Sequence, residues 1–264
     1  MRRMPALVLV LTLLCAACAG PQPHPAAPAP KTAEDGLRAP ETARRAARLL
    51  RDGPEHDPAA ALALLDAYDA KHPPTRKAPG SLLLRALALR LLGRYDEAVA
   101  AANRLILLDP NAADAFVERG LSLAALGRQE RAEEDFDAAL GLNPKSVPAL
   151  LARGDLFFVR EAPDKAEADY SRAIELAPEE PQAWINRGVA RDEQGRYAEA
   201  IGDFSRALAL DPRSATAYAN RGVSRSQSGD MAGMCADYRA ACGLGACVRL
   251  REARDQGYCG EDGR

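Results

Sequence analysis

The chain has 264 residues, a formal net charge of −2, 47% hydrophobic residues and only 5% aromatic residues. Small and aliphatic side chains with so few rings favour closely packed helices over a β-sandwich. The 35 basic and 37 acidic residues nearly balance, which leaves no excess of positive charge to bind nucleic-acid phosphates, so binding of DNA or RNA is not expected.

The N-terminal residues have the features of an export signal. Arg2 and Arg3 precede an apolar run from Ala6 to Leu14, which is too short to cross a bilayer as a helix. The small residues before Cys18 resemble the lipobox of bacterial lipoproteins, in which the cysteine is acylated and becomes the new N terminus. The resemblance implies a signal peptide over residues 1–17 and a lipid anchor on Cys18.

Two features of the lipobox bear on localisation. Ala19 is not the aspartate that tends to retain such lipoproteins in the inner membrane, so the resemblance implies an outer-membrane lipoprotein that faces the periplasm. Cys15 stands where a leucine is usual. The alternative is therefore an ordinary cleavable signal and a soluble periplasmic protein.

Residues 18–40 are rich in proline and alanine. Prolines this closely spaced are incompatible with helix or sheet. At roughly 3 Å per residue, the segment predicts an extended linker of about 60 Å between the lipid and the folded part. A divergent helix pair, Glu41 to Arg51 and Pro58 to Lys71, is predicted next within residues 41–78.

The remainder of the chain repeats itself at a constant interval, which is about 34 residues long. An Arg-Gly pair closes each of four copies, Phe116–Gly120, Leu150–Gly154, Trp184–Gly188 and Tyr218–Gly222. Further along the copies come an alanine (Ala132, Ala166, Ala200), an aromatic residue (Phe136, Tyr170, Phe204) and a proline (Pro110, Pro144, Pro178, Pro212). A period kept across such different residues indicates a repeat array.

This pattern resembles the tetratricopeptide repeat, which has two antiparallel helices per unit. The resemblance implies an all-α, right-handed α-solenoid. Its five units are expected at residues 79–112, 113–146, 147–180, 181–214 and 215–248, followed by a capping helix and tail at 249–264. The small residues let the two helices of a unit approach closely, and Gly93, Gly127, Gly195 and Gly229 fit the left-handed turn between them. The fourth of the six predicted helix pairs has Glu161 and Pro163 instead, which predicts an altered turn.

Arginine and aspartate recur together in this array. An arginine precedes each of the repeated glycines, at positions Arg119, Arg153, Arg187 and Arg221. An aspartate follows each arginine at the same spacing, at positions Asp135, Asp169, Asp203 and Asp237. A recurring pair of opposite charges on facing helices most simply predicts a structural ion pair that links the helices. A ladder of binding residues is the alternative interpretation.

Cysteines gather at the C-terminal end, at positions Cys235, Cys242, Cys247 and Cys259. The segment has no CxxC pair and all three histidines lie far upstream, so a metal site is not expected. An even number of cysteines in an exported protein favours disulfides. A hairpin of the last two helices predicts the pairs Cys242–Cys247 and Cys235–Cys259.

The sequence contains no pattern typical of catalysis. The array lacks histidine, and its glycines fall singly rather than in a phosphate-binding loop. We therefore expect a protein that is not an enzyme and that has no cofactor and no small-molecule substrate.

The resemblance implies a binding scaffold in which the first helix of each unit lines a concave groove for a partner protein or peptide. It places these residues in the groove: Arg90, Glu118, Leu121, Asp155, Phe158, Asn186, Val189, Asp192, Asn220, Val223 and Ser226. Asn186 and Asn220 match family positions that bind a ligand's backbone, although hydrogen bonding to neighbouring turns is the alternative. Arg90 is the one basic group in this set, which disfavours capture of a C-terminal carboxylate and suits a segment with some basic character.

The expected function is therefore that of an interaction scaffold or adaptor in the bacterial cell envelope. A structural, self-associating spacer is the alternative.

Overall fold

The structure, a computed structural model, describes residues 41–51, 56–72 and 80–260. Within these ranges the chain forms helices and no strands, which confirms the predicted all-α class. None of the helices in these ranges is both long enough and apolar enough to cross a membrane. The predictions for Cys18, the signal peptide and the proline-rich linker lie outside the described residues.

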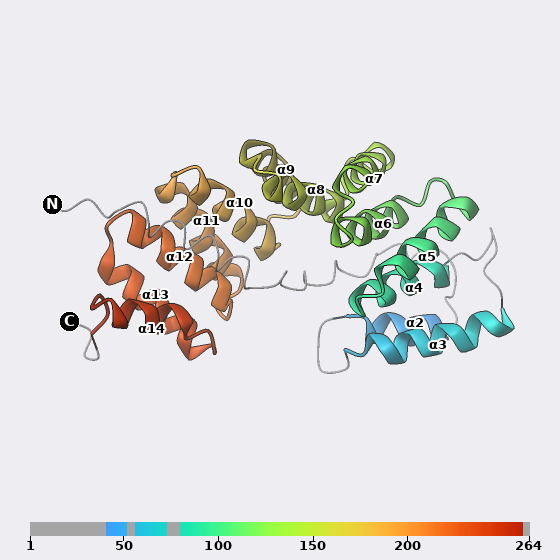
Figure 1. Ribbon diagram of the computed structural model, residues 1–264, viewed down its shortest axis with the longest axis horizontal. Coiled ribbons are helices and arrows are strands. Elements are labelled where there is room, and N and C mark those ends of the chain that lie inside the picture. The colour runs from blue at the N-terminus through green and yellow to red at the C-terminus, as the bar shows by residue number, and fades with distance from the viewer. Residues whose placement is uncertain (1–40, 52–55, 73–79, 261–264) are drawn as a thin grey trace. The chain divides into compact units, whose positions relative to one another are not determined.

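The helices follow one another in pairs along the chain (Figure 1). The divergent pair is α2 (Glu41–Leu49) and α3 (Pro58–Lys71). The first helices of the following units are α4 (Gly80–Leu91), α6 (Ala113–Ala125), α8 (Val147–Val159), α10 (Pro181–Glu193) and α12 (Ala215–Gln227). Their second helices are α5 (Tyr95–Leu108), α7 (Gln129–Leu142), α9 (Pro163–Leu176), α11 (Tyr197–Leu210) and α13 (Met231–Gly243), and α14 (Val248–Asp255) ends the array.

The chain divides into two compact parts, one up to Ser122 and one from Leu123 onward. In the N-terminal part, α2 and α3 pack on each other and on α4, around a core of Ala and Leu side chains such as Ala46, Leu65 and Ala86. In the C-terminal part, α9 and α11 each contact the first helix of their own unit and that of the next unit, while α7 contacts α8 and α13 contacts α12 and α14. This stacking is that of an α-solenoid.

In the C-terminal part, an aromatic ring fills the space beside the repeated glycines. A Cβ atom on Gly154 would lie 2.6 Å from the Tyr170 ring, and one on Gly188 would lie 2.7 Å from the Phe204 ring. Both rings are buried, at 2% and 1% exposed. The first and second helices of a unit are therefore in contact through one ring, at a separation that only glycine allows.

The turns between the paired helices have the predicted left-handed residue. Gly93, Gly127 and Gly195 each have a φ of 73°, a value that L side chains rarely adopt. The predicted alteration at Glu161 is wrong, because Glu161 takes the same conformation with a φ of 56°. The backbone bonds of this turn, from Glu161 N to Phe158 O and from Ala162 N to Phe157 O, repeat those around Gly195. Stacking of the neighbouring helices thus imposes the turn on a residue that does not favour it.

The prolines after the second helices act as predicted. The preceding residues leave helical geometry, with φ between −129° and −141° at Asp109, Asn143, Ala177 and Asp211, because proline excludes the helical conformation of its predecessor.

The predicted ion pairs link the helices of the C-terminal part. Arg187 donates from Nε and Nη2 to both carboxylate oxygens of Asp203, at 3.0 and 2.7 Å. Its third nitrogen donates to Ser171 Oγ on the preceding second helix, at 3.2 Å. The same arrangement joins Arg153 to Asp169 and Asp137, and Arg221 to Asp237 and Ser205. In the N-terminal part Arg119 donates to Asn103 at 2.7 Å. We call these four arginines the arginine ladder.

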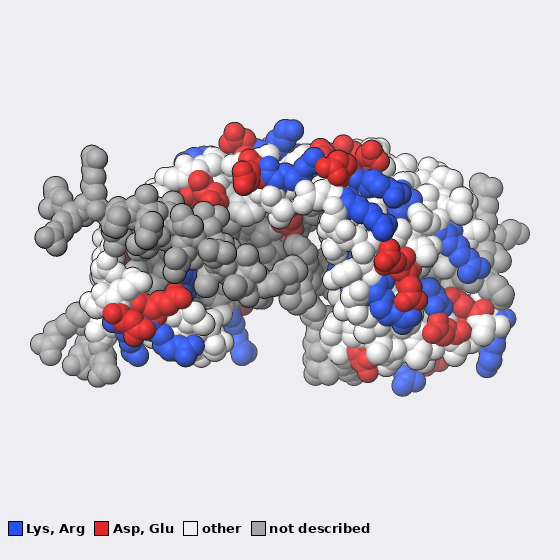
Figure 2. Space-filling view, in the orientation of Figure 1, with Lys and Arg blue, Asp and Glu red and all other residues white. Residues whose placement is uncertain are grey.

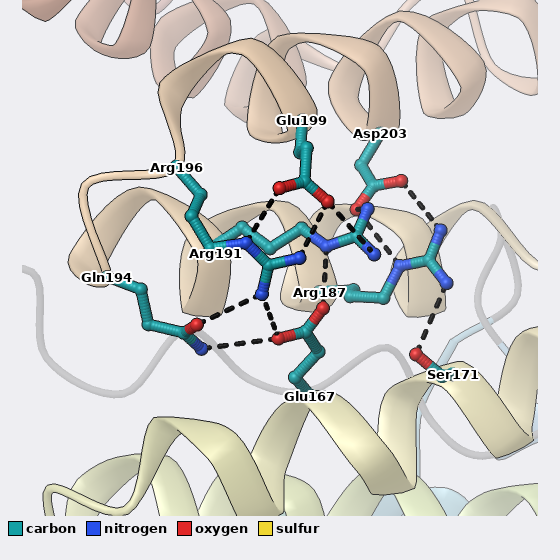
Figure 3. A network of polar contacts seen from close by, with 8 residues as sticks. All are labelled: Glu167, Ser171, Arg187, Arg191, Gln194, Arg196, Glu199 and Asp203. Atoms are coloured by element: carbon teal, nitrogen blue, oxygen red, sulfur yellow. Dashed lines mark hydrogen bonds and ion pairs between the residues drawn. The ribbon is translucent and has the colours of Figure 1, made fainter.

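A second layer of charges surrounds the ladder between α9, α10 and α11 (Figure 3). Arg191 donates to Glu167 and to Asp203, both at 2.8 Å. Arg196 donates to Glu167 at 2.6 Å and forms two bonds to Glu199. Each carboxylate here has at least one arginine partner, so the network satisfies its own charges. It therefore serves packing between units, in agreement with the structural interpretation.

The C-terminal cap closes as predicted. Cys235 is bonded to Cys259 and Cys242 to Cys247. Leu250 and Ala253 of α14 are each 5% exposed and lie in one apolar cluster with Met234 and Tyr238 of α13. The short helix thus covers the apolar face of α13 that would otherwise end the array.

We predict that Gly188→Ala lowers the free energy of unfolding by about 1–3 kcal/mol, because the new methyl group overlaps a buried ring that has no room to move. Gly202→Ala in α11 is the matched control, since no atom lies within 4 Å of the added Cβ. It should raise the free energy of unfolding by roughly 0.5–1 kcal/mol, because alanine has a higher helix propensity than glycine. Urea unfolding of the three proteins measures both effects. Equal losses in both variants would contradict the packing role of Gly188.

We predict that Glu161→Gly raises the free energy of unfolding by roughly 0.5–1 kcal/mol, because glycine adopts a positive φ without steric cost. Gly195→Ala should have the opposite sign and similar size, since it places a side chain in the same conformation. Thermal unfolding tests the pair. A loss of stability in Glu161→Gly would show that its side chain holds the turn.

We predict that Asp203→Asn lowers the free energy of unfolding by about 3 kcal/mol, because it leaves the charges of Arg187 and Arg191 without their buried partner. The Asp203 side chain is 5% exposed. Glu175→Gln removes the exposed Arg172–Glu175 pair, at 50% and 63% exposed, and should change stability by less than about 0.5 kcal/mol. Urea unfolding measures both changes. Comparable losses of stability in the two variants would contradict a stabilising role for the arginine ladder.

Candidate partner-binding face

The candidate site is the face of the first helices on which the groove residues were predicted. The structure places these residues on α4, α6, α8, α10 and α12. Because α4 and α6 up to Ser122 belong to the N-terminal part and α8, α10 and α12 to the C-terminal part, the two sets are described separately.

In the N-terminal part, the predicted groove residues include an ion pair. Arg90 Nε lies 2.8 Å from Glu118 Oε2, and the two side chains are 10% and 9% exposed. The one basic group predicted for the groove is therefore neutralised by its neighbour. Leu121 follows one turn later and is half-buried.

In the C-terminal part, Asp155 is the centre of a polar cluster that joins three helices. Its Oδ1 atom accepts hydrogen bonds from the Tyr170 hydroxyl at 2.7 Å and from Asn186 Nδ2 at 2.9 Å. The Asn186 oxygen accepts in turn from Gln182 at 2.5 Å. The Asn186 amide is thus occupied within the protein, by Asp155 of the neighbouring unit and by Gln182 of the neighbouring turn, as the alternative interpretation predicted.

The same cluster determines the titration of Tyr170. Burial, together with the adjacent carboxylate of Asp155, raises the pKa of Tyr170 far above its usual range. From the sequence, Tyr170 is predicted only as the aromatic residue of the repeat. Its hydrogen bond to Asp155 could have been anticipated from its hydroxyl group, since Phe136 and Phe204 occupy the same position without one.

The remaining predicted residues of this part differ in their packing, hydrogen bonds and burial. Phe158 packs against the cluster of Ala166, Tyr170 and Ala190. The Asp192 carboxylate accepts a hydrogen bond from the buried hydroxyl of Ser224. The other predicted residues of this part, Val189, Asn220, Val223 and Ser226, are half-buried.

Asn220 differs from Asn186, although the two occupy equivalent positions. No hydrogen bond is formed by the Asn220 side chain within residues 41–51, 56–72 and 80–260. Residue 189, one turn before Asp192, is a valine where the preceding unit has Asp155, so the carboxylate that holds Asn186 has no counterpart for Asn220. Of the two predicted asparagines, Asn220 is thus the one whose amide is not occupied by the described part of the chain.

The charges that face the viewer in Figure 2 are mixed in sign, with acidic and basic side chains side by side. This agrees with the balanced composition of the chain and with the paired arginines and carboxylates described above. In the described part of the chain, no three His, Cys, Asp or Glu side chains come together as metal ligands would.

Helix pairs that recur at a constant interval, with a repeated glycine against an aromatic ring, define a helical repeat protein. Models of the tetratricopeptide repeat match residues 84–156, 151–215 and 185–246. Together these matches span more than half of the 264 residues. The chain belongs to the tetratricopeptide-repeat family, whose members generally act as protein–protein interaction scaffolds rather than as enzymes.

Solved structures show the same fold. TTC0263, a thermophilic repeat protein of Thermus thermophilus, has 22% identity and a TM-score of 0.61, over 70% of this chain and 97% of that one. A repeat protein from Parabacteroides merdae has 20% identity and a TM-score of 0.59, over 83% and 88%. YrrB, described as having an unusual peptide-binding site, has 19% identity and a TM-score of 0.56, over 73% and 97%. Among curated protein sequences none matches the chain.

We predict that Tyr170→Phe lowers the free energy of unfolding at pH 7 by about 1.5 kcal/mol, because it removes a hydrogen bond to a carboxylate. The raised pKa keeps Tyr170 protonated in the folded state, while an unfolded tyrosine ionises near pH 10. The stability that Tyr170 contributes is therefore complete below about pH 10 and is lost as the pH rises above it. Urea unfolding at several pH values should show the difference from Tyr170→Phe shrinking above about pH 10.

Tyr238→Phe is the matched control, because the Tyr238 hydroxyl makes no hydrogen bond within the described residues. We expect it to change stability at pH 7 by less than about 0.5 kcal/mol, since no hydrogen bond is lost. Equal losses in the two variants would contradict the special role of the Asp155 bond.

Proposed function

We propose that this protein is an interaction scaffold of the bacterial cell envelope, whose first-helix face binds a segment of a partner protein. The observation that carries the proposal is the Asn220 amide, which makes no hydrogen bond within the described residues, on the predicted face that also holds the half-buried Val189 and Val223. A free amide can bond the backbone of an extended or helical segment, while the valines provide apolar contact for its side chains. The peptide-binding site described for YrrB is consistent with such a use of the fold.

The proposed location rests on the N-terminal sequence and on the cap. Cys18 follows a signal-like segment with the small residues of a lipobox, so we propose that it carries the lipid of an outer-membrane lipoprotein facing the periplasm. The disulfides at the C-terminal end support an exported protein, because such bonds persist in oxidising compartments. A scaffold on a proline-rich spacer would then recruit its partner near the membrane.

A photoreactive amino acid at position 226 tests the proposed face. In cells that make the protein, we expect cross-links from this position to a partner and none from position 206, which lies exposed on the second helix α11. Asn220→Ala should weaken the cross-link at position 226. Cross-links only at position 206 would contradict the proposal, and cross-links between two copies of the chain would favour the spacer instead.

The lipid anchor has a separate test. We expect radioactive palmitate to label the wild-type protein and the Cys15→Ser variant, and to leave Cys18→Ser unlabelled, because of the two cysteines that follow the apolar run, Cys18 has small residues in the two positions before it and Cys15 does not. Labelling of Cys18→Ser would place the lipid elsewhere.

A further inference from the structure

The hydroxyl group of Tyr238 makes no hydrogen bond to the part of the chain that the structure describes, although the residue is buried. Tyr238 is 6% exposed and occupies the position that Tyr170 has two units earlier. Tyr170 bonds to Asp155, but Val223 replaces that carboxylate in the last unit, and the Tyr238 hydroxyl makes no hydrogen bond within the described residues. Among those residues the only fully enclosed polar atom without a partner is Asp69 Oδ1, so the Tyr238 hydroxyl is reached from solvent.

Charged groups from two neighbouring helices and from its own helix act on this hydroxyl. They are Arg249 and Glu252 of α14, Asp192 of α10 and Asp237 of α13. The fold brings Asp192 to this end of α12, because Val223 packs against the apolar cluster of Tyr238 and the next residue, Ser224, bonds to Asp192. Burial is the main cause that raises the pKa of Tyr238; the three carboxylates add to it and Arg249 opposes it. The hydroxyl therefore stays protonated and neutral at physiological pH.

Two of these three carboxylates already have arginine partners. Asp237 is bonded to Arg221 and Arg225, and Glu252 lies 3.3 Å from Arg249. The third, Asp192, accepts only from the Ser224 hydroxyl, and no basic side chain of the described chain pairs with it. Ser224 is fully buried, so it fixes one carboxylate oxygen and leaves the other for a further donor.

We propose that Asp192 and the Tyr238 hydroxyl receive a lysine or arginine side chain of the segment that binds the first-helix face. The charged group would donate to the free oxygen of Asp192 and to the Tyr238 oxygen, which both accept hydrogen bonds. Its aliphatic stem would lie along Val189 and Val223, as long basic side chains do on apolar surface. This inference rests on the proposed function and adds the chemistry of one partner residue.

Other ligand classes fit less well. An anion would meet the uncompensated charge of Asp192. A divalent metal ion requires six or more oxygen ligands or a shell of waters held by several carboxylates, whereas one carboxylate and one phenol hydroxyl are present. An organic cation with directed N–H donors matches both groups.

Burial raises the pKa of Asp192. A cation binds only the ionised carboxylate, so the preference for a basic residue should hold above this pKa and fall as the pH drops through it. Binding of the rest of the segment does not depend on this group.

Selection of random twelve-residue peptides displayed on phage, with the full chain as bait, tests the inference. We expect the wild type to enrich peptides with lysine or arginine at one position. Replacing that residue by norleucine in a selected peptide should weaken binding about tenfold, as measured by fluorescence anisotropy. With Asp192→Asn as bait the same replacement should have an effect of less than about twofold.

Two variants separate this site from general electrostatics and from unfolding. Glu193→Gln removes the same charge at the adjacent exposed residue and should keep the tenfold preference. Tyr238→Phe retains the buried ring and should reduce the preference to a few-fold. A preference that survives in Asp192→Asn, or that Glu193→Gln abolishes, would overturn the inference.

The outcomes also distinguish this inference from the proposed function on which it rests. Peptides that bind without a basic residue, and whose binding depends on Asn220, would overturn the role of Asp192 and support the binding face. No enrichment of any peptide would overturn both.

Discussion

The contact between a repeated glycine and the ring of an aromatic residue is the constraint on which the rest of the structure depends. The ring occupies the volume that a side chain would take, as the rings of Tyr170 and Phe204 do against Gly154 and Gly188. This contact sets the distance between the two helices of a unit. Repeated from unit to unit in the C-terminal part, it accompanies a stack in which the second helix of one unit meets the first helix of the next.

Once that spacing is fixed, the arginine ladder can recur. Arg187 lies immediately before Gly188, so the short distance to the second helix also brings its guanidinium to Asp203. Its planar group has enough donors to reach the preceding second helix as well. In the C-terminal part, each arginine of the ladder thus ties three helices together. The stability that it contributes depends on the burial of the carboxylates rather than on charge alone. The exposed pairs on the surface contribute little by comparison.

Features that each unit repeats could be predicted from the sequence. The helix pairs, the ladder partners and the left-handed glycines follow from spacing, because the same local environment returns in every unit, and the disulfide pairs follow from the hairpin of the last two helices. Glu161 could not be predicted in this way, since its conformation is imposed by the stacking of helices on either side. The bonds from Asn186 to Asp155 and from Ser224 to Asp192 were also missed, because each joins side chains of two adjacent units and depends on which residues those units supply.

At these irregular positions the units differ in which polar groups of the binding face have partners within the protein. Where Asp155 meets Tyr170 and Asn186, the face satisfies its own polar groups and becomes rigid. In the last unit Val223 interrupts that pattern, so the Tyr238 hydroxyl is left without the carboxylate that its equivalent has. Since α14 and the disulfides hold this end in place, the missing bond is not relieved by movement of the helices. A solvent-reached hydroxyl that makes no hydrogen bond to the described residues is available to a partner, and binding there requires little further ordering of a helix that is already packed.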